Sequence, residues 1–281
     1  MTINCLEQFT KSMEIRRLSP RTITSYLNAL NRLAAFCTCK ALEILTDDEV
    51  QDHIYHLVGL KLSWSYINVQ VSAYRFFYGI TLRKNLRCFI IPCPKARRKL
   101  PLVMSRDEIK RALAAVQYSA QQSAFFHLLI GCGLRGGEAC RLRLQDLDKG
   151  NQKVWVRAGK GGKDRGVYFP PEVRSAFVRY YKQIGFKDYV FPGINHPNQP
   201  MTEQRARDWF REVKVVAGIQ KRGSLHMWRH TYATQMLENG HDLLEIKRAL
   251  GHTSLQTTMI YLHISSGYGN ERDSPLSHLD D

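Results

Sequence analysis

The sequence lacks the features of a secreted or membrane protein. No basic-then-apolar segment opens the chain, and no run of about 18 apolar residues occurs in its 281 residues. Its seven cysteines are odd in number and scattered, which disfavours a disulfide framework or a zinc site and favours reduced thiols that pack. Asp and Glu form no cluster with metal-ligand spacing. We therefore expect a cytoplasmic protein with no bound metal.

Negative charge is also in short supply. Lys and Arg number 41 against 25 Asp and Glu, which leaves a net charge of +16. Such a surplus favours a polyanion as partner, nucleic acid above all. The alternative is a soluble protein that is merely basic.

The first part of the chain, residues 1–88, reads as a bundle of helices. Ser19 caps a helix that begins with Pro20, and Thr46 to Glu49 forms a capping box for another. A further helix is expected from about Ser63 to Tyr78. Residues 89–101 are rich in proline and basic side chains without helical or strand periodicity, which predicts an extended interdomain linker.

A second domain is expected over residues 102–266, followed by a polar tail at 267–281. The domain opens with a capping box at Ser105 and Glu108. Helices are predicted at 122–131, 171–184 and 202–217, and a β-hairpin at 153–169. The predicted fold is therefore mainly α with a small antiparallel β-sheet, in two domains.

The residues suited to chemistry gather in the last third of the chain. His226 and Arg229 are three residues apart, so on a helix they share one face. His252 follows Gly251, which ends one helix, and Thr253 or Ser254 is placed to cap the next helix, which carries Tyr261. A tyrosine hydroxyl, with a pKa of about 10, needs cations and a base beside it to act as a nucleophile.

Two cationic segments lie upstream of these residues. Arg135 follows a glycine-rich turn, and Glu138 is one helical turn away, where its carboxylate can hold the guanidinium. Lys160 and Lys163 lie near the tip of the hairpin, and for Lys163 we favour a solvated turn.

Each of these residues also has an ordinary structural interpretation. Tyr261 taken alone is a packing residue and Arg229 alone a surface charge. His226 and His230 have the spacing of a metal-binding pair, but the glutamate of the H-E-x-x-H motif is missing. Only the joint pattern favours catalysis.

That joint pattern resembles the tyrosine recombinase family, the phage-integrase-like site-specific DNA recombinases. The resemblance is carried by four motifs in the family's order: G-L-R-G-G-E at Arg135, G-K-G-G-K-D-R at Lys160, H-M-W-R-H at His226 and L-G-H-T-S-L-Q-T-T-M-I-Y ending at Tyr261. In detail the chain is most similar to bacterial integron and Xer-type members. The resemblance also identifies residues 1–88 as a SAM-like DNA-binding domain.

The resemblance implies a role for each residue. Arg135 and Arg229 would clamp the scissile phosphate, and His252 would donate a hydrogen bond to it. His226 would exchange the proton of the tyrosine hydroxyl, and Lys160 would protonate the leaving 5′-oxygen. Tyr261 would attack, which leaves a 3′-phosphotyrosyl bond, so that no cofactor is needed.

The chain departs from the family pattern at a few positions. Trp228 stands where leucine is usual, a change expected to alter packing more than chemistry. Gly136 and Gly137 replace the usual Ile-Ser, which is expected to loosen the start of the helix by up to about 1 kcal/mol per glycine.

The implied function is a bacterial, nucleoid-associated recombinase, for which a place on a mobile genetic element is expected. It would act on double-stranded DNA with paired inverted half-sites, as a homotetramer on DNA and a monomer or weak oligomer in free solution. Two alternatives are a type IB topoisomerase-like nicking and resealing enzyme and a catalytically silent DNA-binding regulator.

Overall fold

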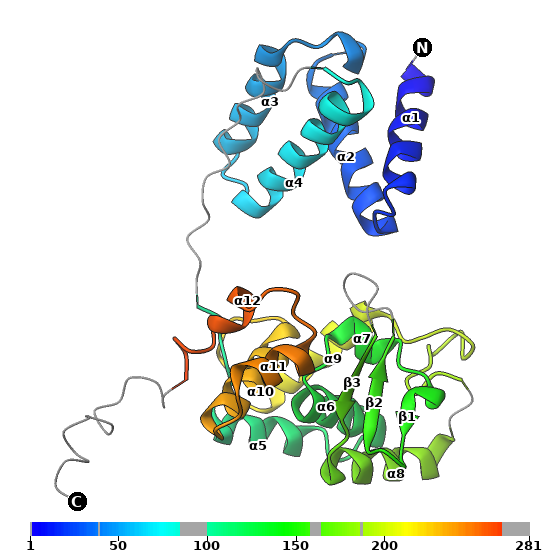
Figure 1. Cartoon of the computed structure of the whole chain (residues 1–281), viewed down its shortest axis with the longest axis vertical. Helices are drawn as coiled ribbons and strands as arrows, with labels where there is room; N and C mark the ends of the chain where they lie inside the picture. The colour runs from blue at the N-terminus through cyan, green and yellow to red at the C-terminus, as the bar shows by residue number, and fades with distance from the viewer. Residues whose placement is uncertain (1, 39, 85–99, 158–163, 186–187, 266–281) are drawn as a thin grey trace, which may run out of the picture. The chain divides into compact units, whose positions relative to one another are not determined.

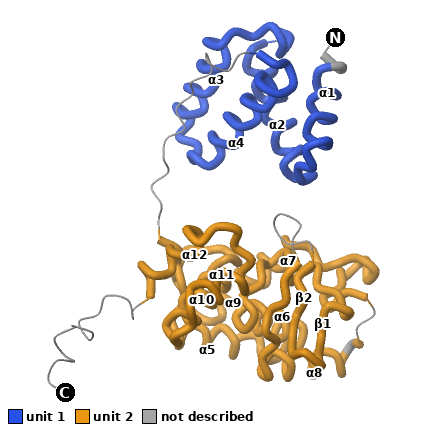
Figure 2. Tube along the Cα trace, in the orientation of Figure 1, with its two compact units in different colours: residues 1–98 blue, residues 99–281 orange. Residues whose placement is uncertain are grey.

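The computed structural model describes residues 2–38, 40–84, 100–157, 164–185 and 188–265. The chain divides into two compact units, Met1–Arg98 and Lys99–Asp281 (Figures 1 and 2). The boundary falls within the predicted linker, of which only Leu100 and Pro101 are among the described residues. The linker therefore stays a prediction, as does the tail at 267–281, which lies outside the described residues.

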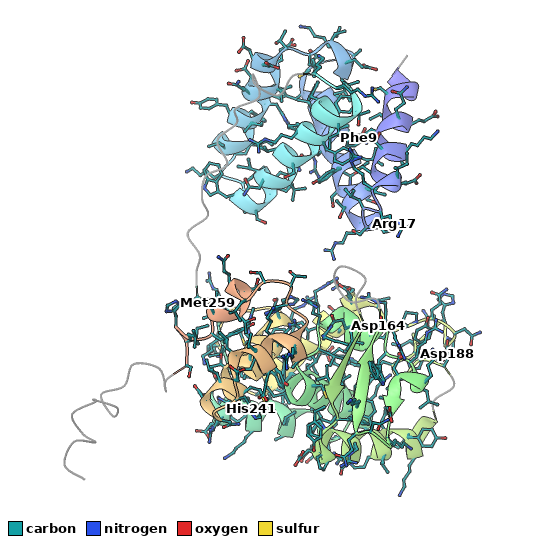
Figure 3. The ribbon with its side chains drawn as sticks, viewed as in Figure 1. Phe9, Arg17, Asp164, Asp188, His241 and Met259 are labelled. Carbon is teal, nitrogen blue, oxygen red and sulfur yellow. The ribbon has the colours of Figure 1, made fainter. Side chains whose placement is uncertain are left out.

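The regular elements described in the first unit are all helical. Its elements are α1 (Thr2–Ile15), α2 (Pro20–Phe36), a 3-10 turn (Leu42–Ile44), α3 (Asp47–Gly59), α4 (Trp64–Arg75) and a π-helical continuation (Phe76–Thr81). The predicted caps are confirmed: Ser19 accepts a hydrogen bond at the start of α2, and Thr46 and Glu49 form the capping box of α3. Phe9 on α1 packs edge-on against Phe76 and Phe77 and closes the core (Figure 3).

The second unit combines helices with one small sheet. In chain order it contains α5 (Arg106–Ala115), α6 (Ala120–Cys132), α7 (Gly136–Cys140), a 3-10 turn (Leu144–Asp146), β1 (Leu147–Asp148), β2 (Lys153–Val156), β3 (Arg165–Tyr168), α8 (Pro171–Ile184), α9 (Glu203–Val216), α10 (His226–Glu238), α11 (Leu243–Leu250) and α12 (Gln256–Met259). The predicted mainly α class with a small antiparallel sheet is confirmed, and so is the capping box at Ser105.

Helix α6 is the centre of this unit. Its side chains are buried on nearly all sides, since α8 and α10 both pack against it. The sheet has the order β1-β2-β3 with antiparallel pairing, and Val156 pairs with Arg165 where the hairpin enters β3. Helix α11 packs beside β3, which brings the last third of the chain against the hairpin (Figure 1).

One sequence-based prediction about the last third is wrong. Gly251 does end α11, in the left-handed conformation with φ 63°. Ser254, one of the two predicted caps, accepts a hydrogen bond from the backbone N–H of Gln256 at 3.3 Å at the start of the next helix, but this helix, α12, ends at Met259, so Tyr261 lies in the turns that follow. Because α12 has a single turn, it ends before it reaches Tyr261. Backbone hydrogen bonds from the N–H of Tyr261 to the carbonyl of Thr258 and from the N–H of Ser265 to the carbonyl of Tyr261 fix the turns that follow.

Four of the seven cysteines lie in the described residues, and all four are free thiols. Cys5, Cys132 and Cys140 are buried and Cys37 is half-buried, as expected for packing residues. Within the described ranges, no helix combines the length and the apolar character needed to cross a membrane.

Candidate active site

Arg135 is fixed at the start of α7 by the chain around it. Gly133 ends α6 with φ 62°, and a Cβ at this position would meet the Tyr232 ring at 2.3 Å, so only glycine fits. The backbone N–H of Arg135 donates to Oε2 of Glu138 at 2.8 Å, and its Nη1 donates to Oε1 at 2.7 Å. The predicted contact between Arg135 and Glu138 is therefore present.

The glycine after Arg135 has a packing role that the sequence did not indicate. A Cβ at Gly136 would come within 2.1 Å of Cδ2 of Leu225, the residue that precedes α10. The missing side chain lets α7 approach the start of α10 closely. The expected cost in helix propensity is thus accompanied by a close contact between two parts of the site.

Glu138 joins three arginines. Besides Arg135, it accepts two hydrogen bonds from Arg165, at 3.0 and 2.7 Å, and lies 3.8 Å from Nη1 of Arg229. Burial alone would raise the pKa of Glu138, but its hydrogen bonds and its attraction to Arg165 and Arg135 outweigh burial and lower that pKa to about 2. The carboxylate is therefore charged at neutral pH and holds the cations together.

Arg165 is the part of this cluster to which the sequence assigned no role. It begins β3, and its Nε donates to the carbonyl of Ala249 at 2.9 Å while its two Nη groups engage Glu138. The contact with Glu138 on α7 crosses 27 residues, and the one with Ala249, where β3 packs beside α11, crosses 84. No local pattern in the sequence signals such a pairing.

Arg229 lies on α10 and is almost fully buried, with 3% of its surface exposed. Its Nη1 donates to the carbonyl of Gly133 at 2.8 Å, and its Nη2 donates to the carbonyl of Leu250. Burial and then the charge of Arg135 lower the pKa of Arg229 to about 9, so the side chain remains a cation at neutral pH. Three guanidinium groups face one carboxylate, which leaves a positive site suited to an anion.

The two predicted histidines come from the start of α10 and the turn after α11. His226 is the first residue of α10 and is exposed; desolvation lowers its pKa, and the charges of Arg229 and Arg135 add to the effect. His252 follows α11, and its Nδ1 lies 2.9 Å from Oγ1 of the buried Thr258. Burial, together with the arginine charges, lowers the pKa of His252 to about 4, so its ring is neutral at pH 7.

Tyr261 lies inside the same site. Its side chain is 1% exposed, and its ring is stacked with that of His252 at a centroid distance of 6.5 Å. Burial raises the pKa of the hydroxyl, whereas the charges of Arg229 and Arg135 act in the opposite direction. The phenol thus lies near both guanidinium groups and is protonated at neutral pH.

The hydroxyl of Tyr261 is hydrogen-bonded to His230, which the sequence analysis treated only as half of a possible metal-binding pair. Its oxygen lies 3.0 Å from Nδ1 of His230. Among the residues that the structure describes, no group of three or more His, Cys, Asp and Glu side chains is arranged to hold a metal ion. The sequence gave His230 no catalytic role because its partner lies 31 residues away.

The remaining predicted residues lie outside the part of the chain that the structure describes. Lys160 and Lys163 fall within 158–163, and their positions stay predictions. Trp228, the departure from the family pattern, is fully buried and packs on Phe126 at a centroid distance of 5.1 Å. Its position supports the expected effect on packing.

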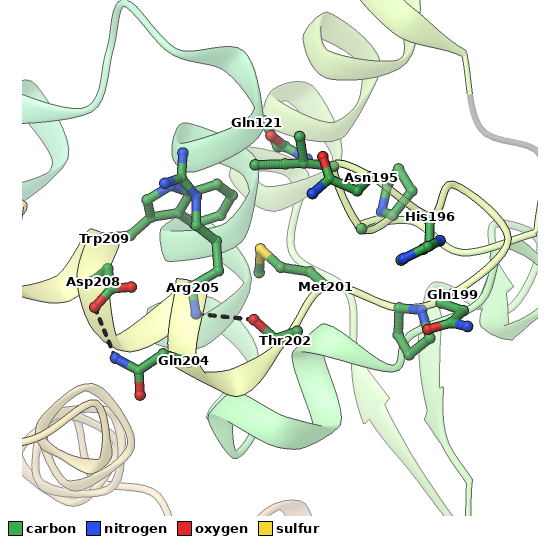
Figure 4. Close-up of a pocket in the computed structure, with 14 residues that line it drawn as sticks. Gln121, Asn195, His196, Gln199, Met201, Thr202, Gln204, Arg205, Asp208 and Trp209 are labelled. Atoms are coloured by element: carbon green, nitrogen blue, oxygen red, sulfur yellow. Dashed lines mark hydrogen bonds between the residues drawn. The ribbon is translucent and has the colours of Figure 1, made fainter.

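A pocket of about 320 Å³ lies elsewhere in the unit, between the loop before α9 and the first turns of that helix. Figure 4 shows its lining, which includes Met201, Arg205 and Trp209. None of the clustered arginines, histidines or Tyr261 lines it. The pocket and the positive cluster are therefore separate features of this unit.

Comparisons with known proteins agree with this site. Residues 103–267 match the model of the phage integrase family, and residues 5–87 match its N-terminal SAM-like domain. A tyrosine recombinase XerC of Pediococcus pentosaceus is 30% identical over 275 residues, which cover 89% of this chain and 89% of that protein.

Solved structures give the same assignment. The crystal structure of XerA recombinase is similar with a TM-score of 0.55 at 29% identity, over 94% of each chain. A lambda integrase tetramer bound to a Holliday junction shares the fold, with a TM-score of 0.75 at 14% identity over 96% of this chain and 79% of that one.

The comparisons favour recombination over a topoisomerase-like activity or a silent regulator. More than half of the chain matches the family model, and a relative that is 30% identical is itself a tyrosine recombinase. The chain therefore belongs to the phage integrase family and is a site-specific recombinase of the tyrosine type.

Proposed function

We propose that the protein cuts and rejoins double-stranded DNA at paired inverted half-sites through a phosphotyrosyl bond at Tyr261. The observation that carries the proposal is the position of one phenol close to two guanidinium groups, those of Arg135 and Arg229, in one unit. A binding module has no need for such a hydroxyl. The net charge of +16 fits a polyanionic duplex as the partner.

In the proposed reaction, the two guanidinium groups bind the non-bridging oxygens of the scissile phosphate. Planar guanidinium groups match phosphate oxygens in pairs and stabilise the charge that builds up as the phosphorus becomes five-coordinate. Their positions are supported by Glu138, which holds Arg135 through two hydrogen bonds, and by the two carbonyls that hold Arg229.

The histidines are proposed to act on the phosphate and its protons. His252 is proposed to carry its hydrogen on Nε2, the nitrogen left for a phosphate oxygen, while the hydroxyl of Thr258 donates to its Nδ1. The ring of His226 lies edge-on to that of His230, and His226 is proposed as a second group at the phosphate or its proton. Lys160 is proposed to protonate the 5′-oxygen as it leaves.

The bond changes preserve the energy of the cut strand. The oxygen of Tyr261 bonds to phosphorus, the bond to the 5′-oxygen breaks, and a 3′-phosphotyrosyl link and a 5′-hydroxyl remain. A 5′-hydroxyl from a partner duplex can reverse the step and reseal the strand. We propose that four copies assemble on two duplexes, as the lambda integrase tetramer does on a Holliday junction.

A nicked suicide substrate tests the proposal. The wild-type protein should form a covalent adduct at the 3′-phosphate, and Tyr261→Phe should bind the same DNA and form none. Tyr232→Phe is the matched control, because Tyr232 is buried in the same core cluster and is expected to form normal adduct. An adduct that persists in Tyr261→Phe would place the nucleophile elsewhere.

A further inference from the structure

A hydrogen bond inside the site has no place in the roles assigned above. The hydroxyl of Tyr261 lies 3.0 Å from Nδ1 of His230, with ring centroids 5.8 Å apart. His230 is on α10, one turn after His226 and next to Arg229. Among the residues that the structure describes, His230 is the hydrogen-bond partner of this hydroxyl.

We propose that His230 is the catalytic base of this recombinase: its Nδ1 takes the proton of Tyr261 as the phenol oxygen attacks the scissile phosphate. The inference rests on the proposed function, because it requires Tyr261 to be the nucleophile. It reassigns the proton that the family resemblance gave to His226, whose ring lies 6.1 Å from that of His230.

The protonation states fit this assignment. Burial and the charges of His226 and Arg229 lower the pKa of His230 to about 4, so its ring is neutral at pH 7 and has one nitrogen free to accept. Burial keeps the phenol protonated despite the arginines. The proposal assigns to His230 the tautomer with its hydrogen on Nε2, so that the hydroxyl of Tyr261 donates to Nδ1.

The charged groups around His230 favour transfer only when the phosphate is bound. His226 and Arg229 both lower the pKa of His230 and so oppose a positive charge on its ring in the free protein, while His252 is a further titratable neighbour whose ring is neutral at pH 7. A phosphate anion between the two arginines offsets those charges and raises the proton affinity of His230. The base is thereby activated by its own substrate.

The proposed step balances. The O–H bond of Tyr261 breaks and its proton moves to Nδ1 of His230, which gives an imidazolium. The phenol oxygen then bonds to phosphorus. The 5′-oxygen leaves and takes a proton from the acid proposed at Lys160. In the sealing direction, a 5′-hydroxyl attacks and Nδ1 returns the proton to the phenolate. His230 is thus restored in each cycle.

Asparagine at position 230 separates proton transfer from positioning. Its side-chain oxygen can occupy the place of Nδ1 and accept the hydrogen bond of Tyr261, but it does not take up a proton. We expect His230→Asn to bind DNA like the wild type and to lower the single-turnover rate of adduct formation at pH 7 by about 10²–10⁴-fold. The exposed His241 on the loop before α11 supplies the control, and His241→Asn should cleave at the wild-type rate (Figure 3).

The pH profile supplies the second readout. A substrate with a 5′-bridging sulfur leaving group removes the need for an acid, so its cleavage reports on the nucleophile alone. The rate of His230→Asn should rise about tenfold per pH unit from pH 7 to 9 as the phenol ionises, whereas the wild-type rate should stay nearly flat. His226→Asn should lower the rate without introducing that slope.

Each outcome decides the assignment. A His230→Asn rate within threefold of the wild type, or a pH slope that appears in His226→Asn instead, would overturn it. Failure of the wild type itself to form an adduct would refute the proposed function. Loss of DNA binding by His230→Asn would show that His230 serves the structure of the site and would overturn its role as base.

Discussion

Glu138→Gln tests whether one buried carboxylate holds the catalytic arginines together. Glutamine keeps the shape of the side chain but removes the charge that faces Arg135, Arg165 and Arg229. The carboxylate of Glu138 is 6% exposed, so solvent screens these attractions little. Removing it leaves buried guanidinium groups without a counter-charge, which is strongly destabilising.

The magnitude follows from the pKa of Glu138. The folded protein lowers it from 4.5 to about 2. At 1.36 kcal/mol per pKa unit, the difference corresponds to about 3 kcal/mol of stability at neutral pH. Because the folded pKa is the lower one, this contribution is complete above about pH 5 and is lost as the pH falls towards 2. Glu138→Gln should therefore cost about 3 kcal/mol at pH 7 and much less at pH 2.

Urea unfolding at several pH values measures this difference. Three of the four tryptophans, Trp155, Trp209 and Trp228, lie in the second unit, so their fluorescence reports on its unfolding. Glu203→Gln is the matched control: Glu203 also faces two arginines, at 3.5 and 3.6 Å, but is 41% exposed, and its loss should cost less than about 1 kcal/mol. A cost for Glu138→Gln below 1 kcal/mol at pH 7, or one that does not change with pH, would refute the reasoning.

Three further predictions concern the same site. Arg165→Lys keeps the charge but loses the paired hydrogen bonds to Glu138. It should lower the free energy of unfolding by about 1–3 kcal/mol and slow adduct formation. DNA affinity, measured by gel shift, should stay within a few-fold of the wild-type value. Thr258→Val removes the hydrogen bond at Nδ1 of His252 without changing the shape of the side chain at position 258. Single-turnover cleavage should slow about tenfold. An unchanged rate would count against a role for this hydrogen bond. Strand cleavage should survive EDTA, because guanidinium groups supply the positive charge at the phosphate, and activity that disappears on chelation and returns with magnesium would contradict this.

Local signals in the sequence predicted most of the secondary structure. Caps at Ser19, Thr46 and Ser105 join residues three positions apart, so their partners are fixed by the geometry of one helical turn. The contact between Arg135 and Glu138 has the same spacing, and it too was predictable. The boundary at Tyr261 was not, because a single turn of helix carries too weak a pattern to show where it ends.

The sequence by itself determined the family of the protein and the inventory of reactive groups, since four motifs in a fixed order specify both. Only the tertiary structure decided which groups meet. His230 on α10 reaches Tyr261, in the turn after α12, across 31 residues, and Arg165 on β3 reaches Glu138 on α7 across 27. The physical reason is that hydrogen bonds are formed over about 3 Å in space whatever the separation along the chain, so a partner supplied by another element leaves no trace in local spacing.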